Sequence, residues 1–217
     1  MTGLNIIDPG RLLSWNVGYR PKTTGIVLHH AEANGCTVYD INRWHKGNGW
    51  AGIGYHFYVR KDGSVYAGRG IDRVGAHAGA NPSKPAYKYE NWANRETVGI
   101  CAEGRYQTET MPEVQKQAIV RLCRYVIEKY PTVTRIYRHS DISATDCPGD
   151  KFPFDEIVSE VWKKEPERGR FDAADARYAL RAAAGLEDYK AVYDLNGDGR
   201  ITADEAREAL REAAKLK

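Results

Sequence analysis

Strand-like and helix-like segments alternate over the first 165 residues, and this alternation restricts the possible folds more than any other feature. Short apolar or β-prone runs typical of strands occupy residues 25–29, 55–60, 64–66, 97–101 and 135–139. Helical patterns lie between and after them, at residues 39–46, from about 110 to 130, and at 154–163. Chains with this alternation form α/β domains. Residues 1–162 are therefore predicted to form one α/β domain.

Local signals refine two of these elements. The Asp62-Gly63 dipeptide stands between two β-prone runs, which is a strong signal for a β-hairpin. The longest helix is expected to begin near Thr110, with Glu113 completing a capping box, and to end at Pro131.

The C-terminal part of the chain has a different organisation. Residues 163–169 are charged, contain proline and glycine and lack periodicity, so they are predicted to be a linker. Residues 169–186 align with residues 199–216 at a constant offset of 30 and without a gap. Two copies of a loop–helix unit are therefore expected within a small all-α module at residues 170–217.

Composition narrows the possible partners and compartments. The 217 residues carry a net charge of +3 without a Lys/Arg cluster, so nucleic acid is not expected as a partner. No apolar run approaches the roughly 18 residues that a membrane span needs. The first residues lack the blocks of a signal peptide, so the protein is expected to be made in the cytoplasm without a leader. The four cysteines show no close pairing and are predicted to be free thiols.

Three side chains are candidates for a catalytic zinc site. His29 and His139 each end a predicted strand, and Cys147 follows His139 by eight residues across a loop long enough to double back. Imidazole nitrogen and thiolate sulfur are ligands that zinc prefers, and a catalytic ion with three protein ligands keeps its fourth position open. A histidine at a strand end is more often structural, so these residues on their own leave both interpretations open.

Four blocks of sequence lie around these residues, at 41–63, 74–81, 98–101 and 139–149. They contain Gly-Tyr55-His-Phe, Val-Gly-Ala-His77, Val98-Gly-Ile-Cys, and the stretch from His139 to Cys147-Pro-Gly. Together they resemble the type-2 N-acetylmuramoyl-L-alanine amidases, which include phage lysozymes of the amidase type and animal peptidoglycan-recognition proteins. The resemblance covers roughly residues 20–162. It implies a mixed central β-sheet flanked by helices, with a bound zinc ion.

The resemblance also implies roles for individual residues. The family's zinc ligands fall on His29, His139 and Cys147, with His30 a neighbour rather than a ligand. Tyr55 matches the family's active-site tyrosine. Thr145 falls where phage members often carry lysine, and it is expected to help hold the tetrahedral intermediate.

A second set of residues is expected to contact the substrate. His77 and Asn81 are predicted to line the substrate groove. His45 and Trp50 either line it as well or pack beneath it. Glu103 is interpreted as structural. The implied activity is hydrolysis of the bond between the muramic acid lactyl group and L-alanine, by an endolysin released to the bacterial cell wall. The alternative is a peptidoglycan-binding or scaffold-attached wall protein without catalytic activity.

The segment from residue 194 to 205 fits the twelve-residue loop of an EF-hand. Carboxylate and amide side chains stand at positions 1, 3 and 5, a glycine stands at position 6, and a glutamate closes the loop at position 12. The predicted calcium ligands are Asp194, Asn196, Asp198, Arg200 through its carbonyl, Thr202 and Glu205.

The preceding copy of the loop lacks ligands, because lysine, proline and arginine occupy its first, third and fifth positions. One structural calcium ion is therefore expected. The paired loop–helix units resemble dockerins, which implies a cohesin-like partner, with self-association, wall binding or simple stabilisation of the enzyme as alternatives.

Overall fold

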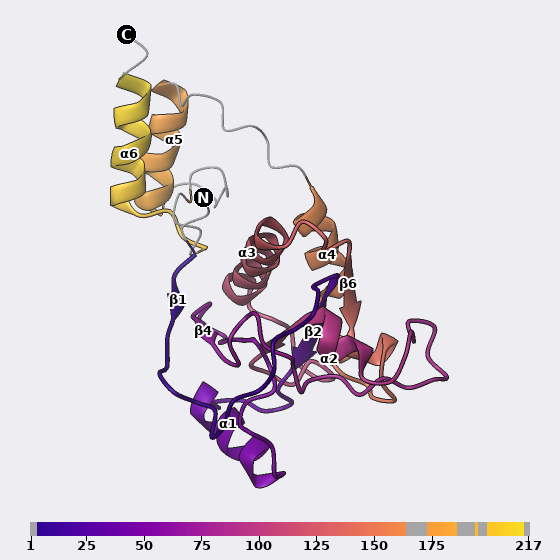
Figure 1. Cartoon of the computed structure of the whole chain (residues 1–217). Coiled ribbons are helices and arrows are strands. Elements are labelled where there is room, and N and C mark those ends of the chain that lie inside the picture. The colour runs from indigo at the N-terminus through magenta and orange to yellow at the C-terminus, as the bar shows by residue number, and fades with distance from the viewer. Residues whose placement is uncertain (1–3, 164–172, 186–193, 195–198, 215–217) are drawn as a thin grey trace.

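A computed structural model describes residues 4–163, 173–185, 194 and 199–214 of the chain (Figure 1). Its centre is a six-stranded sheet in the order β1-β4-β3-β5-β2-β6. The strands are β1 (Ile6–Ile7), β2 (Gly25–His30), β3 (Phe57–Val59), β4 (Val65–Ala67), β5 (Thr97–Ala102) and β6 (Arg135–Arg138). β3 and β4 form the antiparallel hairpin that Asp62-Gly63 predicts, and the other pairs are parallel. The predicted mixed sheet is confirmed.

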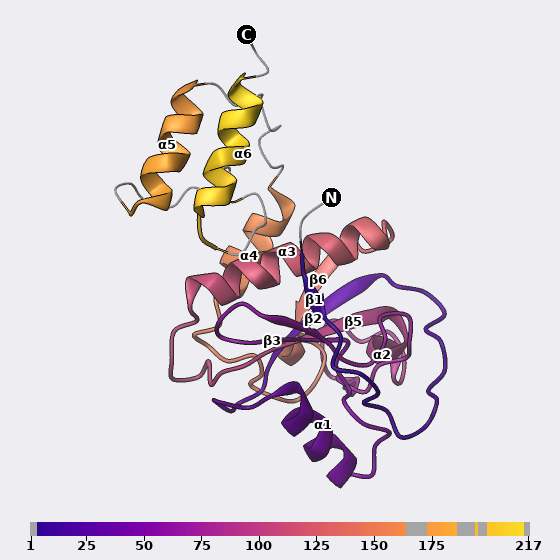
Figure 2. The same cartoon turned by 90° about the vertical axis from the view of Figure 1, so that its left-hand side faces the viewer.

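Helices cover both faces of this sheet (Figure 2). The α-helices of this part of the chain are α1 (Val38–Gly47), α2 (Trp92–Glu96), α3 (Glu113–Lys129) and α4 (Phe154–Trp162), and a short 3-10 helix, η1 (His139–Asp141), follows β6. Alternate residues of β2 point to opposite faces, as the pleat of a strand requires. Ile26 and Leu28 pack with buried side chains of α3 and α4, whereas Val27 packs with α2 on the other face. β2 therefore has both faces buried, and its apolar sequence follows from that position.

The beginnings of two helices illustrate where sequence signals hold and where they fail. α1 begins with a complete capping box, in which Thr37 and Asp40 bond each other's backbone N–H groups. The capping box predicted at Thr110 is wrong. Pro112 has an extended conformation, with ψ at 141°, so helical geometry begins only at Glu113 and no side chain caps the helix.

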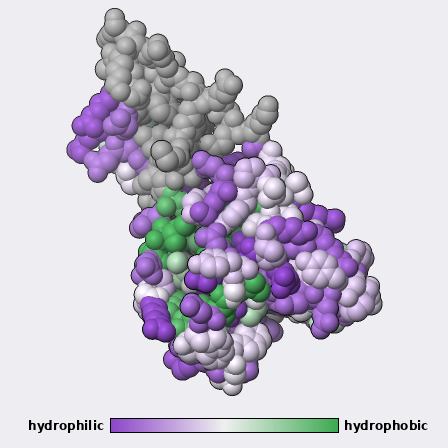
Figure 3. Space-filling model, in the orientation of Figure 1, coloured by the Kyte–Doolittle hydropathy of each residue, from purple (hydrophilic) through white to green (hydrophobic). Residues whose placement is uncertain are grey.

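The C-terminal region contains α5 (Ala173–Ala183) and α6 (Ala203–Ala214), which pack against each other through a small cluster that includes Ala179 and Ala206. The predicted linker lies outside the described residues apart from Lys163, which directly follows α4. None of the described helices is both long and apolar enough to cross a membrane. On the face shown in Figure 3, hydrophilic side chains predominate and the hydrophobic ones gather in small patches.

Candidate metal centre

Parallel pairing of two central strands brings His29 and His139 together. β2 and β6 run parallel, with Leu28 opposite Arg138, so the next residues along both strands are the two histidines. Their ring centroids lie 4.4 Å apart. Carboxyl ends of adjacent parallel strands meet at one edge of a sheet, which is where open α/β sheets place their ligands.

Cys147 reaches the same edge because the loop after β6 folds back. The Ser140 N–H donates to the Cys147 carbonyl at 2.8 Å, which closes the loop. The Cys147 thiol then lies 3.8 Å from His29 Nδ1 and accepts from the backbone N–H of His30 at 3.4 Å. One ligand atom from each of His29, His139 and Cys147 lies within 4.8 Å of the others, a spacing that can hold a metal ion.

The donor set fits zinc in chemistry and in distance. Zinc–nitrogen bonds of about 2.0–2.1 Å and a zinc–sulfur bond of about 2.3 Å, at a tetrahedral angle, place nitrogen and sulfur roughly 3.5 Å apart. The observed 3.8 Å between His29 Nδ1 and Cys147 Sγ is within a few tenths of an ångström of that value. Two imidazoles and one thiolate would leave a fourth zinc position for a further ligand.

The protonation of the two imidazoles also suits a cation. Burial, followed by the neighbouring imidazoles of His139 and His77, lowers the pKa of His29 well below its usual range. Burial likewise lowers the pKa of His139 to about 4, so both imidazoles are neutral near pH 7. Burial raises the pKa of Cys147 to about 12 in the protein alone. A bound metal ion reverses this effect, because a coordinating thiol loses its proton outright.

A row of aromatic rings leads from the metal centre to the surface. The Tyr55 ring lies 5.0 Å from that of His29, His45 lies 5.3 Å from Tyr55, and Trp50 lies 4.8 Å from His45, as distances between ring centroids. Trp50 is 41% exposed and ends the row. His45 is fixed by the Gly54 N–H, which donates to its Nδ1 at 2.9 Å. The structure therefore connects three of the predicted site residues, Tyr55, His45 and Trp50, to His29 through successive ring contacts.

The phenol of Tyr55 keeps its proton. Burial, followed by the nearby Cys101 and Cys147 thiols, raises its pKa well above the usual range. A phenol that stays protonated can donate a hydrogen bond to an oxyanion that develops next to the metal centre.

Thr145 and Asn81 both organise loops beside the centre. The Thr145 hydroxyl accepts the backbone N–H of Cys147 at 3.2 Å and so helps shape the loop that carries this cysteine. Asn81 donates its backbone N–H to the Ile142 carbonyl at 2.9 Å, while its side-chain oxygen accepts from Ser83.

His77 is buried on the Nε2 side of the His29 ring. Its Nδ1 stands 3.1 Å from His29 Nε2. The backbone N–H groups of His77 and Ala78 both donate to Asn94 Oδ1. Sequence reasoning missed Asn94, because nothing local connects it with a residue 17 positions away.

Two further groups near the centre have other partners. His30 accepts the Tyr106 backbone N–H at its Nδ1 and does not join the cluster, in agreement with the expectation that it is a neighbour. The buried carboxylate of Glu103 bonds the backbone N–H of Gly35 and the guanidinium of Arg60, as expected of a structural residue.

The predicted calcium loop is described only in part, because Asn196 and Asp198 lie outside the described residues. Asp194 is buried, and its carboxylate accepts the Gly199 N–H at 2.8 Å. Gly199 has φ at +84°, which suits the glycine of a sharp turn. Glu205 bonds both the backbone N–H and the hydroxyl of Thr202 at the start of α6. Arg200 is exposed.

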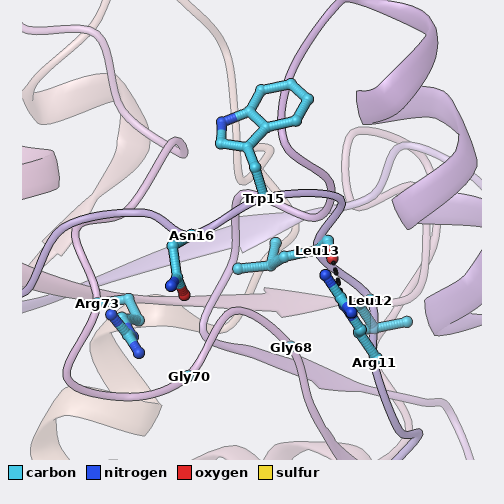
Figure 4. A pocket seen from close by; sticks show the side chains of 8 residues that line it. All are labelled: Arg11, Leu12, Leu13, Trp15, Asn16, Gly68, Gly70 and Arg73. Carbon is cyan, nitrogen blue, oxygen red and sulfur yellow. Dashed lines mark hydrogen bonds between the residues drawn. The ribbon is translucent and has the colours of Figure 1, made fainter.

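A pocket of about 340 Å³, lined by none of the candidate site residues, lies between the N-terminal segment and the loop after β4 (Figure 4). Its lining contains no histidine, cysteine or carboxylate, so it offers neither metal ligands nor an acid–base pair. The Arg73 guanidinium is already engaged, since it bonds the Val17 carbonyl at 2.9 Å and stacks over Tyr19 at 4.0 Å. The lining residues are Arg11, Leu12, Leu13, Trp15, Asn16, Gly68, Gly70 and Arg73.

Known proteins resemble this chain in sequence and in fold. Peptidoglycan-recognition protein SC2 of Drosophila melanogaster is 33% identical over 134 residues, which cover 57% of this chain and just under two thirds (66%) of that protein. The endolysin of Klebsiella phage KP32 is 31% identical over 137 residues, covering 59% of this chain and 82% of that protein. The endolysin N-acetylmuramoyl-L-alanine amidase LysCS from Clostridium intestinale URNW superposes with a TM-score of 0.65 at 36% identity, covering 74% of this chain and 97% of that chain.

A family model agrees with these likenesses. The model described as N-acetylmuramoyl-L-alanine amidase, Amidase_2, matches residues 19–150. The match includes both strands that carry the histidines and the loop that carries Cys147. This chain belongs to the N-acetylmuramoyl-L-alanine amidase family.

Proposed function

We propose that the chain is a zinc-dependent amidase that hydrolyses the bond between the lactyl group of N-acetylmuramic acid and L-alanine in peptidoglycan. The observation that carries this proposal is the complete cluster of His29, His139 and Cys147 at one edge of the sheet. Family membership and two relatives named as endolysins support the substrate and the reaction. Action on the bacterial cell wall as a phage or prophage endolysin is part of the proposal.

Each residue of the proposed site has a distinct task. His29, His139 and Cys147 would hold the zinc ion. When bound, zinc supplies Lewis acidity, which polarises the scissile carbonyl and acidifies a water molecule. Tyr55 would donate its phenolic proton in a hydrogen bond to the carbonyl oxygen as negative charge develops there. Thr145 orders the Cys147 loop and can offer its O–H to the same oxygen. His45 and Trp50 extend from the centre towards the surface and would contact the stem peptide or the sugar.

The reaction is a hydrolysis with a simple balance. The oxygen of one water molecule bonds to the lactyl carbonyl carbon, and the carbon–nitrogen bond to L-alanine breaks. The products are a lactyl carboxylate and a free alanine amine, which takes up a proton.

The test is cleavage of purified cell walls. We expect the protein to lower the turbidity of a wall suspension and to release new L-alanine N-termini. A chelator should abolish both signals, and added zinc should restore them. If no L-alanine N-termini appear in the presence of zinc, the enzymatic proposal is wrong.

A second candidate function is recognition of peptidoglycan without cleavage. The similarity to a protein named for peptidoglycan recognition favours it. The same assay separates the two functions, because a binding protein would sediment with the walls and leave their turbidity and their N-termini unchanged.

We further propose that residues 1–162 are the catalytic domain and residues 170–217 a separate module with one calcium site. The pattern of carboxylates and glycine from Asp194 to Glu205 supports the site, and the Gly199 N–H bond to Asp194 is compatible with such a loop. Calorimetric titration should find about one calcium ion per chain. Two sites or none would contradict this proposal. Whether the module takes a cohesin-like partner or a second copy stays a prediction.

A further inference from the structure

The two ring nitrogens of His29 face different partners. Nδ1 lies 3.8 Å from Cys147 Sγ, within the metal centre. Nε2 lies 3.1 Å from Nδ1 of His77, on the far side of the ring. We propose that His77 is a positioning residue, whose Nδ1 accepts the Nε2–H of His29 and holds Nδ1 of His29 bare and directed at the metal. This inference rests on the proposed zinc-dependent function.

The direction of this hydrogen bond follows from coordination chemistry. A nitrogen that binds a metal carries no proton, so a neutral imidazole ligand keeps its proton on the other nitrogen. His29 must therefore donate through Nε2, and His77 must accept at Nδ1 and carry its own proton on Nε2. Metal-bound histidines usually donate to a carboxylate or a carbonyl. Here the acceptor is a neutral imidazole, which orients the ligand without adding negative charge to the site.

The surroundings of His77 leave its ring little freedom. The strand β5 passes one edge of the ring at Gly99, where a Cβ would lie 2.5 Å from the His77 Cγ. Gly75 is as close, since a Cβ there would lie 2.5 Å from the His77 Cδ2. The ring of His56 stands edge-on at 5.5 Å between centroids. Two glycines and one ring thus form a cradle that fits an imidazole in this orientation.

The hydrogen bonds of His77 point to the same role. Its backbone N–H is held by Asn94 Oδ1 at 2.8 Å, which fixes the start of the side chain. Its Nε2 is buried and makes no hydrogen bond with any described residue. The ring also interacts with the backbone of Thr97, and its Nδ1 makes its hydrogen bond with His29. A buried imidazole whose Nδ1 forms a hydrogen bond with a candidate metal ligand can fix the orientation of that ligand.

The test compares two substitutions that differ in one acceptor atom. In His77→Asn, the amide oxygen can take the place of Nδ1, whereas His77→Leu has similar bulk and no acceptor. Zinc affinity is measured by competition with a chromophoric chelator, and folding by circular dichroism. We expect His77→Leu to lose about 10- to 100-fold in zinc affinity, the usual effect of removing a partner of a metal ligand. His77→Asn should stay within about threefold of the wild type, because it keeps the acceptor. Gln117→Leu is the control, because it removes a polar side chain of α3 that bonds Glu113 and Glu160 and not the metal centre, and its zinc affinity should equal that of the wild type.

A second measurement uses the wild-type protein and is unaffected by folding of the variants. Nitrogen-15 NMR of the zinc-loaded chain should show His29 protonated at Nε2 and His77 protonated at Nε2 but not at Nδ1. The opposite protonation of either ring would overturn the inference, as would equal zinc affinities of His77→Leu and the wild type. Both of these outcomes leave the proposed function standing if the wild type binds zinc and cleaves walls. A wild-type chain that binds no zinc would overturn both.

Discussion

Replacing Gly99 by alanine tests whether the cradle around His77 is as rigid as the structure indicates. Gly99 lies in β5, where it pairs with Val27 of β2 on one side, and on the other side its carbonyl accepts the backbone N–H of His56 and its N–H donates to His56 Nδ1. An alanine Cβ would lie 2.5, 2.6 and 2.8 Å from Cγ, Cδ2 and Nδ1 of the His77 ring. Ordinary carbon contacts are about 3.5–4.0 Å, so the methyl group overlaps the ring by roughly 1 Å.

The expected loss of stability depends on whether the strand or the His77 ring can move away from the added methyl group. The strand cannot retreat without breaking pairs on two sides, and the ring cannot retreat because Gly75, His29 and His56 surround it. Overpacking of this kind costs about 1–3 kcal/mol. We therefore expect Gly99→Ala to lower the free energy of unfolding of the zinc-free protein by that amount. Because the methyl group displaces Nδ1 of His77, zinc affinity should fall as well.

The assay is urea unfolding followed by circular dichroism, with the chelator competition for zinc. Gly79→Ala is the matched control, since a Cβ there meets no atom within 4 Å and its backbone conformation is one that alanine adopts readily. The control should stay within about 0.5 kcal/mol of the wild type. If Gly99→Ala unfolds at the same urea concentration as the wild type, the cradle is not rigid and the reasoning fails.

Three further predictions concern other parts of the molecule. Tyr55→Phe should lower kcat by about 10²- to 10³-fold, as loss of one oxyanion donor does, without changing zinc affinity, and an unchanged kcat would exclude that role. Burial alone would raise the pKa of Glu96, but bonds from Tyr89, Lys22, Lys88 and Thr24 lower it to about 2. A lowered pKa stabilises the fold above the unfolded value of 4.5 and ceases to do so as the pH falls towards about 2. Glu96→Gln should therefore cost about 2 kcal/mol at pH 7, allowing for the exposed lysines, and much less at pH 3. A pH-independent difference in urea unfolding would refute this. Glu205→Gln should weaken calcium binding in calorimetry, since position 12 supplies two oxygens, and unchanged affinity would argue against an EF-hand loop.

Sequence patterns predicted the elements that depend on local chemistry. The apolar run of β2, the Asp-Gly hairpin and the periodicity of α3 and α4 all appear at nearly the expected residues. The short elements were missed. β1 has two residues and exists through its pairing with β4, and α2 has five residues that follow Asn91 in a left-handed conformation, with φ at 59°. Such elements are stabilised by neighbours distant in the sequence and leave little local signal.

For the candidate metal centre, the sequence alone predicted which residues form the cluster. His29, His139 and Cys147 stand in motifs that name them, and the ends of parallel strands bring such residues together. Only the tertiary structure decided which nitrogen of His29 faces the centre and what the other nitrogen meets. His77 is buried with its Nδ1 against Nε2 of His29, and its place in a substrate groove stays a prediction. Its buried position depends on Gly75 and Gly99 leaving room for the ring, and on Asn94 holding its backbone. These contacts join segments far apart in the chain, and packing of that kind is set by the folded shape and not by any local pattern.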